Sequence, residues 1–297
     1  MTDRYFIGSS DISTILNLNP FSTVLELWAE KTGQIPPRDL SDNEAVEWGT
    51  RLERVVSKKF SEKHEVKLIA YKKRFHHPKY DFLSCELDNL IAGTDEIVEI
   101  KTTNAWKFKA WEDDIPPYIT CQVMWALGIT GRKIGHIAVL VGGQKYLEKR
   151  VEFDAQIFNA MVKKAVIFWN EFILTKKMPA TITSKDGSTL FQLYSGEDIQ
   201  LPVELTDREE AIIESIDSLT ADKYAVEAEI EQQKNELKTK LGDSVTGFTN
   251  NHRVSWKRQE TKRVDSKKLK SEYPDIYENC INIIPSRVLR IYDKKGE

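Results

Sequence analysis

The sequence predicts an α/β or α+β domain, followed by a long helix and a small C-terminal region. Three observations predict this organisation. Up to about residue 180, segments with helical spacing of apolar residues alternate with segments in which apolar and polar residues alternate one by one. A polar stretch containing Pro, Gly and Ser then runs from 179 to 202. Beyond it, apolar residues recur at steps of three, four and seven from Leu205 to Leu241, which is a heptad seam.

The N-terminal domain is expected to begin with helices. Segment 17–33 has a Pro-initiated turn, apolar residues at helical spacing, and Gly33 as a stop signal. Strands are predicted at 66–71, 82–91 and 97–102, where apolar and polar side chains alternate. A further helix is predicted at 43–64, with an apolar stripe formed by Val46, Leu52, Val55, Val56 and Phe60.

The rest of the chain divides in the same way. The predicted elements are a helix at 118–131, a hairpin of strands 136–142 and 146–153 around Gly142-Gly143, a helix at 155–176, strands at 244–249 and 253–259, a helix from about Asp265 and a strand at 287–292. We therefore assign a domain to 1–178, a linker to 179–204, a heptad-patterned helix to 205–242 and a small basic α+β region to 243–297. A heptad seam needs a partner surface, either the protein's own tail or another molecule.

Composition excludes several classes of protein. The chain has 297 residues and a formal net charge of −3. Its three cysteines, Cys85, Cys121 and Cys280, form no CxxC pair, which excludes a disulfide framework, a four-cysteine zinc site and a four-cysteine iron–sulfur cluster. No apolar run approaches the ~20 residues of a membrane span, and the sequence contains no P-loop motif. We expect no cleaved signal peptide, because no basic segment followed by an apolar run is found near residue 1. A reducing cytoplasm is the expected compartment.

The charge is unevenly distributed along the chain. Residues 251–270 contain eight basic and two acidic residues. This run is either a solvated face or a binding surface for phosphates or for an acidic partner. The candidate binding residues are Arg253, Lys257, Arg258, Lys262 and Arg263.

The segment 82–101 carries the clearest chemical signal. If Gly93-Thr94 forms a two-residue hairpin turn, Asp88 lies opposite Glu99, and Glu86 lies opposite Lys101. Strand alternation places Asp88 on the face opposite Leu87. Two carboxylates directly across a ladder repel each other, which a hard divalent cation such as Mg²⁺ would relieve. Lys101 could then orient or deprotonate an attacking water. The alternative is a surface hairpin with ordinary ion pairs.

Four further motifs accompany this pattern. They are Ile7-Gly-Ser-Ser-Asp11 with Leu18-Asn-Pro20 and Leu27-Trp28, then Trp48-Gly-Thr-Arg-Leu-Glu53, then Tyr118-Ile-Thr-Cys-Gln122 with Trp125, and Val139-Leu-Val-Gly-Gly143. In this order they resemble the YqaJ/lambda-exonuclease family of PD-(D/E)XK nucleases over residues 1 to about 175. The resemblance implies a PD-(D/E)XK, restriction-endonuclease-like core.

The resemblance also implies a role for individual residues. Asp88, Glu99 and the Ile100 carbonyl would bind metal, supported by Glu53. Lys101 would activate or orient the attacking water. Gln122 would contact metal-bound water or the terminal nucleotide, although a solvated amide is the alternative. A pocket for a 5′-phosphate would contain Ser10. Two further residues are candidates there: Arg4, one position out of register with the family arginine, and Tyr118, which could instead be a packed aromatic residue.

The function implied is a Mg²⁺-dependent 5′→3′ exonuclease of phage recombination, acting on double-stranded DNA ends, with Mn²⁺ able to substitute. Its expected partners are further copies of the chain, in a ring of three, and a single-strand annealing protein of the RecT/Redβ type. Two alternatives remain: a site-specific endonuclease of the same fold, and a non-catalytic module that binds DNA ends or a partner.

Overall fold

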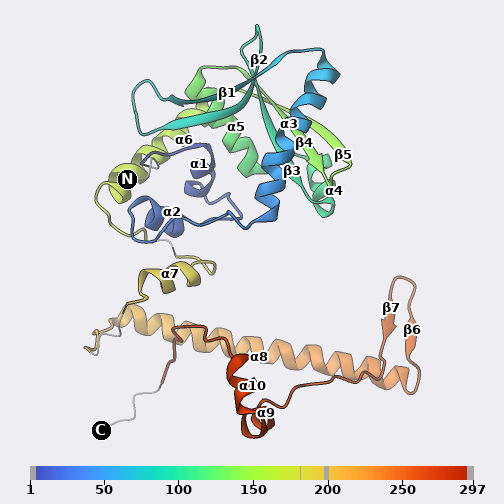
Figure 1. Ribbon diagram of the computed structural model, residues 1–297. Coiled ribbons are helices and arrows are strands. Elements are labelled where there is room, and N and C mark those ends of the chain that lie inside the picture. The colour runs from blue at the N-terminus through green and yellow to red at the C-terminus, as the bar shows by residue number, and fades with distance from the viewer. Residues whose placement is uncertain (1–4, 181, 197–200, 293–297) are drawn as a thin grey trace. The chain divides into compact units, whose positions relative to one another are not determined.

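The computed structural model describes residues 5–180, 182–196 and 201–292 (Figure 1). The chain divides into two compact units, Met1–Ser195 and Gly196–Glu297, called here the N-terminal and C-terminal units. The mixed α/β class predicted from the sequence is confirmed. No helix among the described residues is long and apolar enough to cross a membrane.

The N-terminal unit is built around one five-stranded sheet with the order β1-β2-β3-β4-β5. All neighbours are antiparallel except β3 and β4, which run parallel and are joined through α5. The elements are α1 (Ser9–Ile15), α2 (Val24–Lys31), α3 (Glu44–His64), β1 (Leu68–His76), β2 (Ser84–Ile91), β3 (Glu96–Thr103), η1 (Ala105–Lys107), α4 (Phe108–Asp113), α5 (Pro117–Thr130), β4 (Ile134–Val141), β5 (Lys145–Glu152), α6 (Ala155–Phe168), the π-helical turn η2 (Trp169–Ile173) and α7 (Gly187–Leu193).

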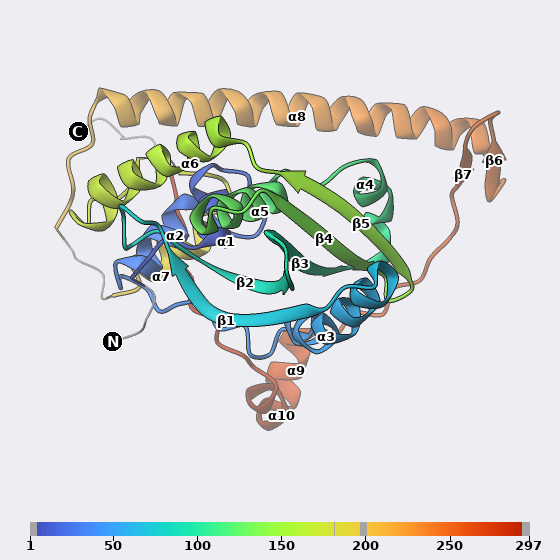
Figure 2. The ribbon, with the colours of Figure 1, turned by 90° about the horizontal axis from the view of Figure 1, so that it is seen from above.

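The sheet separates two hydrophobic cores. The larger core joins α1, α2, α5 and α6 to one face of the sheet, and Figure 2 shows the strands curling around α5. The smaller core packs Val56 and Phe60 of α3 against Val98 and Ile100 on the other face. Both faces of β3 are therefore covered along part of its length, and its last three residues, 101–103, are each partly exposed.

Helix α3 shows how local signals set these elements. It begins after Asn43, whose side-chain oxygen accepts hydrogen bonds from the Ala45 and Val46 N–H groups. The predicted apolar stripe is only partly correct: Val56 and Phe60 are buried, whereas Val46 and Val55 are 43% and 59% exposed. Only the second half of α3 contributes buried residues to a core.

The segment predicted as a linker contains a helix. Asp186, before α7, is fully buried and accepts hydrogen bonds from Thr23 Oγ1 at 2.5 Å and from the Thr183 N–H at 2.6 Å. These bonds attach α7 to the start of α2, and the N-terminal unit accordingly runs to Ser195. A polar, Gly- and Ser-containing sequence did not reveal this because its most deeply buried side chain, Asp186, is a carboxylate.

The C-terminal unit contains α8 (Asp207–Leu241), the hairpin β6 (Thr246–Phe248) and β7 (Arg253–Ser255), α9 (Ser266–Glu272) and α10 (Pro274–Asn279). The long helix starts with a capping box between Thr206 and Glu209. The strand predicted at 287–292 is wrong, because residues 280–292 have no regular structure. The helix predicted from Asp265 is split into α9 and α10 at Pro274, which lacks the N–H that would continue the first helix.

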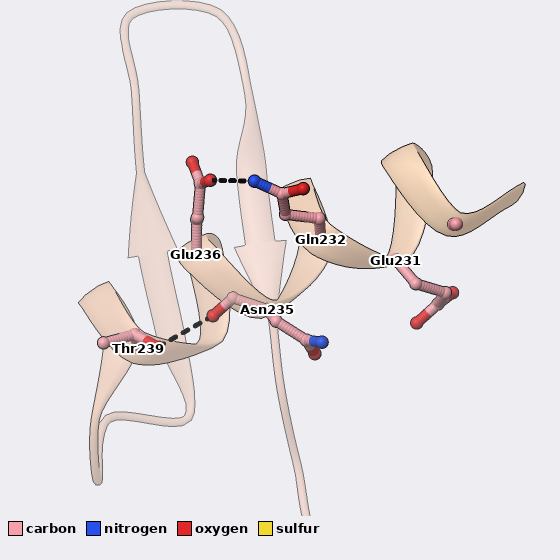
Figure 3. Close-up of a pocket in the computed structure, with 6 residues that line it drawn as sticks. Glu231, Gln232, Asn235, Glu236 and Thr239 are labelled. Atoms are coloured by element: carbon pink, nitrogen blue, oxygen red, sulfur yellow. Dashed lines mark hydrogen bonds between the residues drawn. The ribbon is translucent and has the colours of Figure 1, made fainter. Parts of the chain in front are cut away.

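No residue at 196 or in 201–292 is buried. The heptad seam of α8 is exposed by 39–64% at Ile212, Ile216, Leu219, Val226, Ile230 and Leu237. Polar side chains of α8 bond locally instead, as Gln232 does to Glu236 beside a shallow surface hollow in Figure 3. Among the described residues of the C-terminal unit itself, nothing buries the apolar seam.

Candidate active site

Asp88 lies at a β-bulge in strand β2. Leu87 pairs with Tyr71 of β1, and Asn89 pairs with the adjacent Ala70, so Asp88 is an extra residue in the ladder. Leu87 and Leu90 both pack on the larger core, whereas the Asn89 side chain donates a hydrogen bond to Ser57 Oγ on α3. The bulge shifts the alternation by one residue. The strict alternation predicted through Asp88 is therefore wrong at this position.

The carboxylate of Asp88 is directed to β3. Its Oδ2 accepts a hydrogen bond from the Ile100 N–H at 2.8 Å. Burial raises the pKa of Asp88, and the negative charge of Glu99 raises it further, while the Ile100 N–H and the Lys101 ammonium lower it in part. A carboxyl group in such an environment would be stabilised in its ionised form by an added cation.

The predicted register of the hairpin is confirmed where the strands pair. Asn89 lies opposite Val98, and Leu90 lies opposite Ile97. The turn differs from the prediction: residues 92–95 form a four-residue connection, and Gly93, at φ +79°, is third in a turn closed by the Thr94 N–H and the Ile91 carbonyl. A positive φ at that third position favours glycine.

Glu86 and Lys101 do not face each other as predicted. Glu86 instead bonds Arg74 on β1, with 2.8 Å between Oε1 and Nη2. Lys101 bonds Glu99 on its own strand, with 2.6 Å between Nζ and Oε1. The physical reason is the bulge at Asp88, which disturbs the alternation before the ladder would reach Glu86.

Lys101 carries a retained positive charge. Burial lowers its pKa, but the Glu99 carboxylate, its hydrogen bond and Asp88 outweigh that effect, so the net direction is upward. Lys101 therefore stays an ammonium at neutral pH and acts as a donor. This favours the predicted role of orienting a water or a phosphate oxygen over that of removing a proton.

Glu53 approaches the cluster from α3. Gly49, one turn earlier, lies against Thr102 of β3, where an added Cβ would be 3.5 Å from Thr102 Oγ1. Glu53 is half-buried, and its negative charge contributes to the raised pKa of Asp88. Among the residues that the structure describes, no three His, Cys, Asp or Glu side chains form a complete metal-binding cluster. Asp88 and Glu99 are thus the central pair, with Glu53 outside it.

Helix α5 brings Tyr118 close to the cluster. Burial raises the pKa of Tyr118 while the charge of Lys101 lowers it, so the phenol and the ammonium lie within interaction range. Tyr118 also packs on the larger core and meets the Phe21 ring edge-on, with 5.9 Å between centroids. The position of Tyr118 is therefore compatible both with contact to DNA and with a role as a packed aromatic residue. Gln122 follows by one turn on the same helix face and is half-buried.

Ser10 lines a separate cavity of about 910 Å³ between α1, α2 and the end of η2. Asp11, in the same wall, accepts a hydrogen bond from the Gly8 N–H. It also forms an ion pair with Lys31, with 2.8 Å between Asp11 Oδ2 and Lys31 Nζ. Lys31 is a cation that the sequence did not single out, because a lysine near the end of a helix ordinarily faces solvent. Arg4, the predicted cation of this pocket, lies outside the described residues.

The predicted basic residues of the C-terminal unit are all exposed. Arg253 is on β7, and the other four, Lys257, Arg258, Lys262 and Arg263, are in the irregular segment 256–265. Arg258 lies 4.0 Å from Glu260, a weak surface contact. These residues form part of a different unit from Asp88 and Lys101.

The model of the YqaJ-like viral recombinase domain matches residues 3–133. The chain is 34% identical to the uncharacterized protein YqaJ of Bacillus subtilis (strain 168), over 93% of this chain and 87% of that protein. The chain therefore belongs to the YqaJ family, as predicted.

Solved structures show partial likeness. An alkaline exonuclease from Laribacter hongkongensis is 16% identical, covering 57% of this chain and 89% of that chain, with a TM-score of 0.48. The same enzyme in complex with dAMP is 17% identical, covering 58% and 90%, with a TM-score of 0.49. A phage-related exonuclease from Haemophilus somnus 129PT is 11% identical, covering 58% and 96%, with a TM-score of 0.47.

Proposed function

We propose that this protein is a Mg²⁺-dependent exonuclease that digests double-stranded DNA ends 5′→3′ and leaves 3′ single strands. The observation that supports this most is the juxtaposition of Asp88, Glu99 and Lys101 at one point of the sheet in a YqaJ-family chain. Two acidic groups and one retained cation are the groups that phosphodiester hydrolysis requires around a divalent metal.

The donor set suits a hard cation. Asp88 and Glu99 offer carboxylate oxygens, the Ile100 carbonyl can add one more, and no soft ligand is required. Burial and the charge of Glu99 raise the pKa of Asp88, and a bound Mg²⁺ would offset both by stabilising the ionised carboxylate. When bound, Mg²⁺ supplies Lewis-acid chemistry at the phosphate, and Mn²⁺, with the same oxygen preference, should substitute.

The chain's own residues then have separable tasks. The Ile100 N–H fixes the Asp88 carboxylate, and the Lys101 ammonium keeps its proton and donates to the attacking water or to a phosphate oxygen. Glu53 adds negative charge from α3, and Gln122, on the face of α5 that carries Tyr118, contacts water or the terminal nucleotide. These roles follow the resemblance and the placement of the side chains.

Polarity and assembly belong to the same proposal. The cavity at Ser10, with Lys31 in its wall, would hold a 5′-phosphate, and Phe21 lines both this cavity and the Tyr118 contact. A 5′ end held there would direct digestion 5′→3′. A ring of three copies would keep the enzyme on its duplex, in keeping with the family resemblance.

The C-terminal unit would recruit a single-strand annealing protein of the RecT/Redβ type. Its heptad seam is exposed, and α8 carries ten acidic and five basic residues. Lys223 occupies a seam position, so two parallel copies of α8 would place like charges together. A different protein with an apolar, basic-flanked helix is the better match. The basic segment 253–263 would hold DNA or an acidic part of that protein.

The test uses linear duplex DNA labelled at either 5′ or 3′ end, with Mg²⁺, beside supercoiled circular DNA. Release of the 5′ label as mononucleotide, with the circle intact, supports the proposal. Nicking of the circle would indicate an endonuclease instead. Binding of ends without hydrolysis would indicate a non-catalytic module.

A further inference from the structure

Three segments that are distant in sequence meet beside Lys101. Phe21 comes from the loop before α2, Lys107 from η1 and Tyr118 from the first turn of α5. Phe21 meets Tyr118 edge-on at 5.9 Å between centroids, and Lys107 Nζ lies 5.2 Å from the centre of the Phe21 ring. Tyr118 in turn interacts with Lys101. We call Phe21, Lys107 and Tyr118, together with the adjoining Trp106, the aromatic ledge.

Trp106 is the most exposed large apolar side chain of the described residues, at 93%. It lies in η1, three residues after the end of β3 and five residues after Lys101. Its neighbours are firmly held: Ala105 packs against Gly142, where an added Cβ would be 2.8 Å from Ala105 Cβ, and Trp111 is only 2% exposed. Gly142 also has φ +59°, which a larger residue would adopt only with strain. An anchored backbone therefore presents a free indole to solvent.

This combination fits one class of ligand. Exposed aromatic rings beside a lysine provide stacking faces for bases and a charge for the phosphates between them. Stacking is tolerant of sequence, as an enzyme that digests DNA of any sequence needs. Phe21, 56% exposed, also borders the cavity that contains Ser10, so the aromatic ledge lies between that cavity and the catalytic lysine.

We infer that Trp106 and Phe21 stack on nucleobases at the DNA end, and that Lys107 contacts a neighbouring phosphate. The inference rests on the proposed function and adds to it: Trp106 and Phe21 are positioning residues that align the strand with Lys101. They take no part in the bond-breaking step. Removing an indole that only holds the substrate should weaken DNA binding and spare the chemistry.

Kinetics on two substrates separate these effects. With linear duplex DNA, Trp106→Ala should raise KM about tenfold or more, and Trp106→Phe should restore most of the loss. With bis(p-nitrophenyl) phosphate, which has no base to stack, both variants should match the wild type. Tyr194→Ala, which removes a 51% exposed ring at the end of α7, is the matched control and should behave as wild type on both substrates.

Photochemical crosslinking gives a direct readout. The full-length Lys101→Ala variant, which cannot cleave, is irradiated with a duplex that carries 5-iododeoxyuridine at its end. Crosslinks at Trp106 or Phe21 support the inference. A KM for duplex DNA within twofold of wild type in the Trp106→Ala variant would overturn the inference. The inference would also be overturned if Trp106→Ala weakened association between copies of the protein and left DNA binding unchanged. Failure of the wild type on both substrates would instead refute the proposed function.

Discussion

The side chain of Asp88 on β2 and the backbone N–H of Ile100 on β3 are joined by a hydrogen bond of 2.8 Å. This bond lies just beyond Asn89 and Val98, the last residues that pair between the two strands. A carboxylate thus replaces the next rung of the ladder. The backbone of β3 thereby fixes a candidate metal ligand, and the neighbouring Glu99 and Lys101 are placed by the same strand.

Removing any of the three central groups should abolish cleavage while leaving the fold intact. Asp88→Asn, Glu99→Gln and Lys101→Ala should each lower the rate on linear duplex by about 10³-fold or more, because they remove the groups that stabilise charge at the reacting phosphate. Circular dichroism and DNA-binding assays should remain near wild type. Glu86→Gln is the matched control, since Glu86 lies on the same strand but bonds Arg74. Near-normal turnover by Lys101→Ala would refute the role given to its ammonium.

Metal binding should be visible without any substrate. Mg²⁺ should raise the melting temperature of the wild-type protein, since a ligand that binds only the folded state stabilises it. The shift should be absent in the Asp88→Asn, Glu99→Gln double variant. Ca²⁺ should support DNA binding with poor hydrolysis, because its looser coordination positions groups less strictly. An equal Mg²⁺ shift in the double variant would place the metal elsewhere.

The cavity at Ser10 predicts a preference for phosphorylated ends. Duplex with a 5′-phosphate should be digested faster than the same duplex with a 5′-hydroxyl, and Ser10→Ala should reduce that ratio. Lys31 is a poorer first target, because its removal would leave Asp11 without the ion pair at 2.8 Å. Initial rates on the two ends give the answer. Equal wild-type rates on both would exclude this cavity as the phosphate site.

The C-terminal unit should be removable after Ser195 but not after Lys177. Truncation after Lys177 deletes Asp186, whose carboxylate accepts bonds from Thr23 and Thr183, and should cost roughly 2–4 kcal/mol of stability. A chain ending at Ser195 should keep its melting transition and its nuclease activity. It should lose affinity for the annealing protein in a pull-down or calorimetric titration. Unchanged affinity would show that the C-terminal unit is not the docking site.

Glu148 predicts a pH-dependent contribution to stability. It accepts a hydrogen bond from Lys63 at 2.8 Å, which attaches the end of α3 to β5, and another from Tyr146 on its own strand at 2.6 Å. Burial raises its pKa, but the bonds from Lys63, Tyr146 and His64 outweigh this, and the net direction is downward. Its contribution is therefore present above the ordinary glutamate pKa of 4.5 and is lost as pH falls through the lower folded-state value.

Glu148→Gln should therefore lower the melting temperature at pH 7 by a few degrees, on the order of 1 kcal/mol for the weakened bonds. The difference between variant and wild type should narrow as the pH drops below the ordinary glutamate pKa of 4.5 and through the lower folded-state value. Glu152→Gln, on the same strand but 70% exposed, is the control and should have little effect. A difference that is constant from pH 7 to pH 3 would mean that the charge of Glu148 is not the source of stability.

The sequence predicted most elements of the N-terminal unit because caps, turns and alternation are local signals. Asn43 capping α3 and the register of Asn89 opposite Val98 are two examples. The orientation of Asp88 could not be predicted, because the bulge depends on how β1 pairs with β2, and β1 has no motif that sets its register. Glu86 was misplaced for the same reason.

Long-range polar contacts were equally hidden. Asp186 reaches Thr23 across 163 residues of chain, and Lys31 meets Asp11 only after α1 and α2 fold together. No spacing rule links such pairs. Seam exposure was also unpredictable, because a heptad pattern shows that a helix can be covered and not what covers it.

The length of α8 has a further consequence for kinetics. Its 35 residues extend about 52 Å at ~1.5 Å per residue, and residues 196–206 of the chain connect it to the N-terminal unit. A molecule docked anywhere along the helix is confined to a small volume around the same chain. If the proposed function holds, its encounter with a strand released by that chain would be intramolecular, at an effective concentration of the order of millimolar. Capture would then depend little on how much of that molecule is free in solution, and a fresh strand would be covered before competitors arrive.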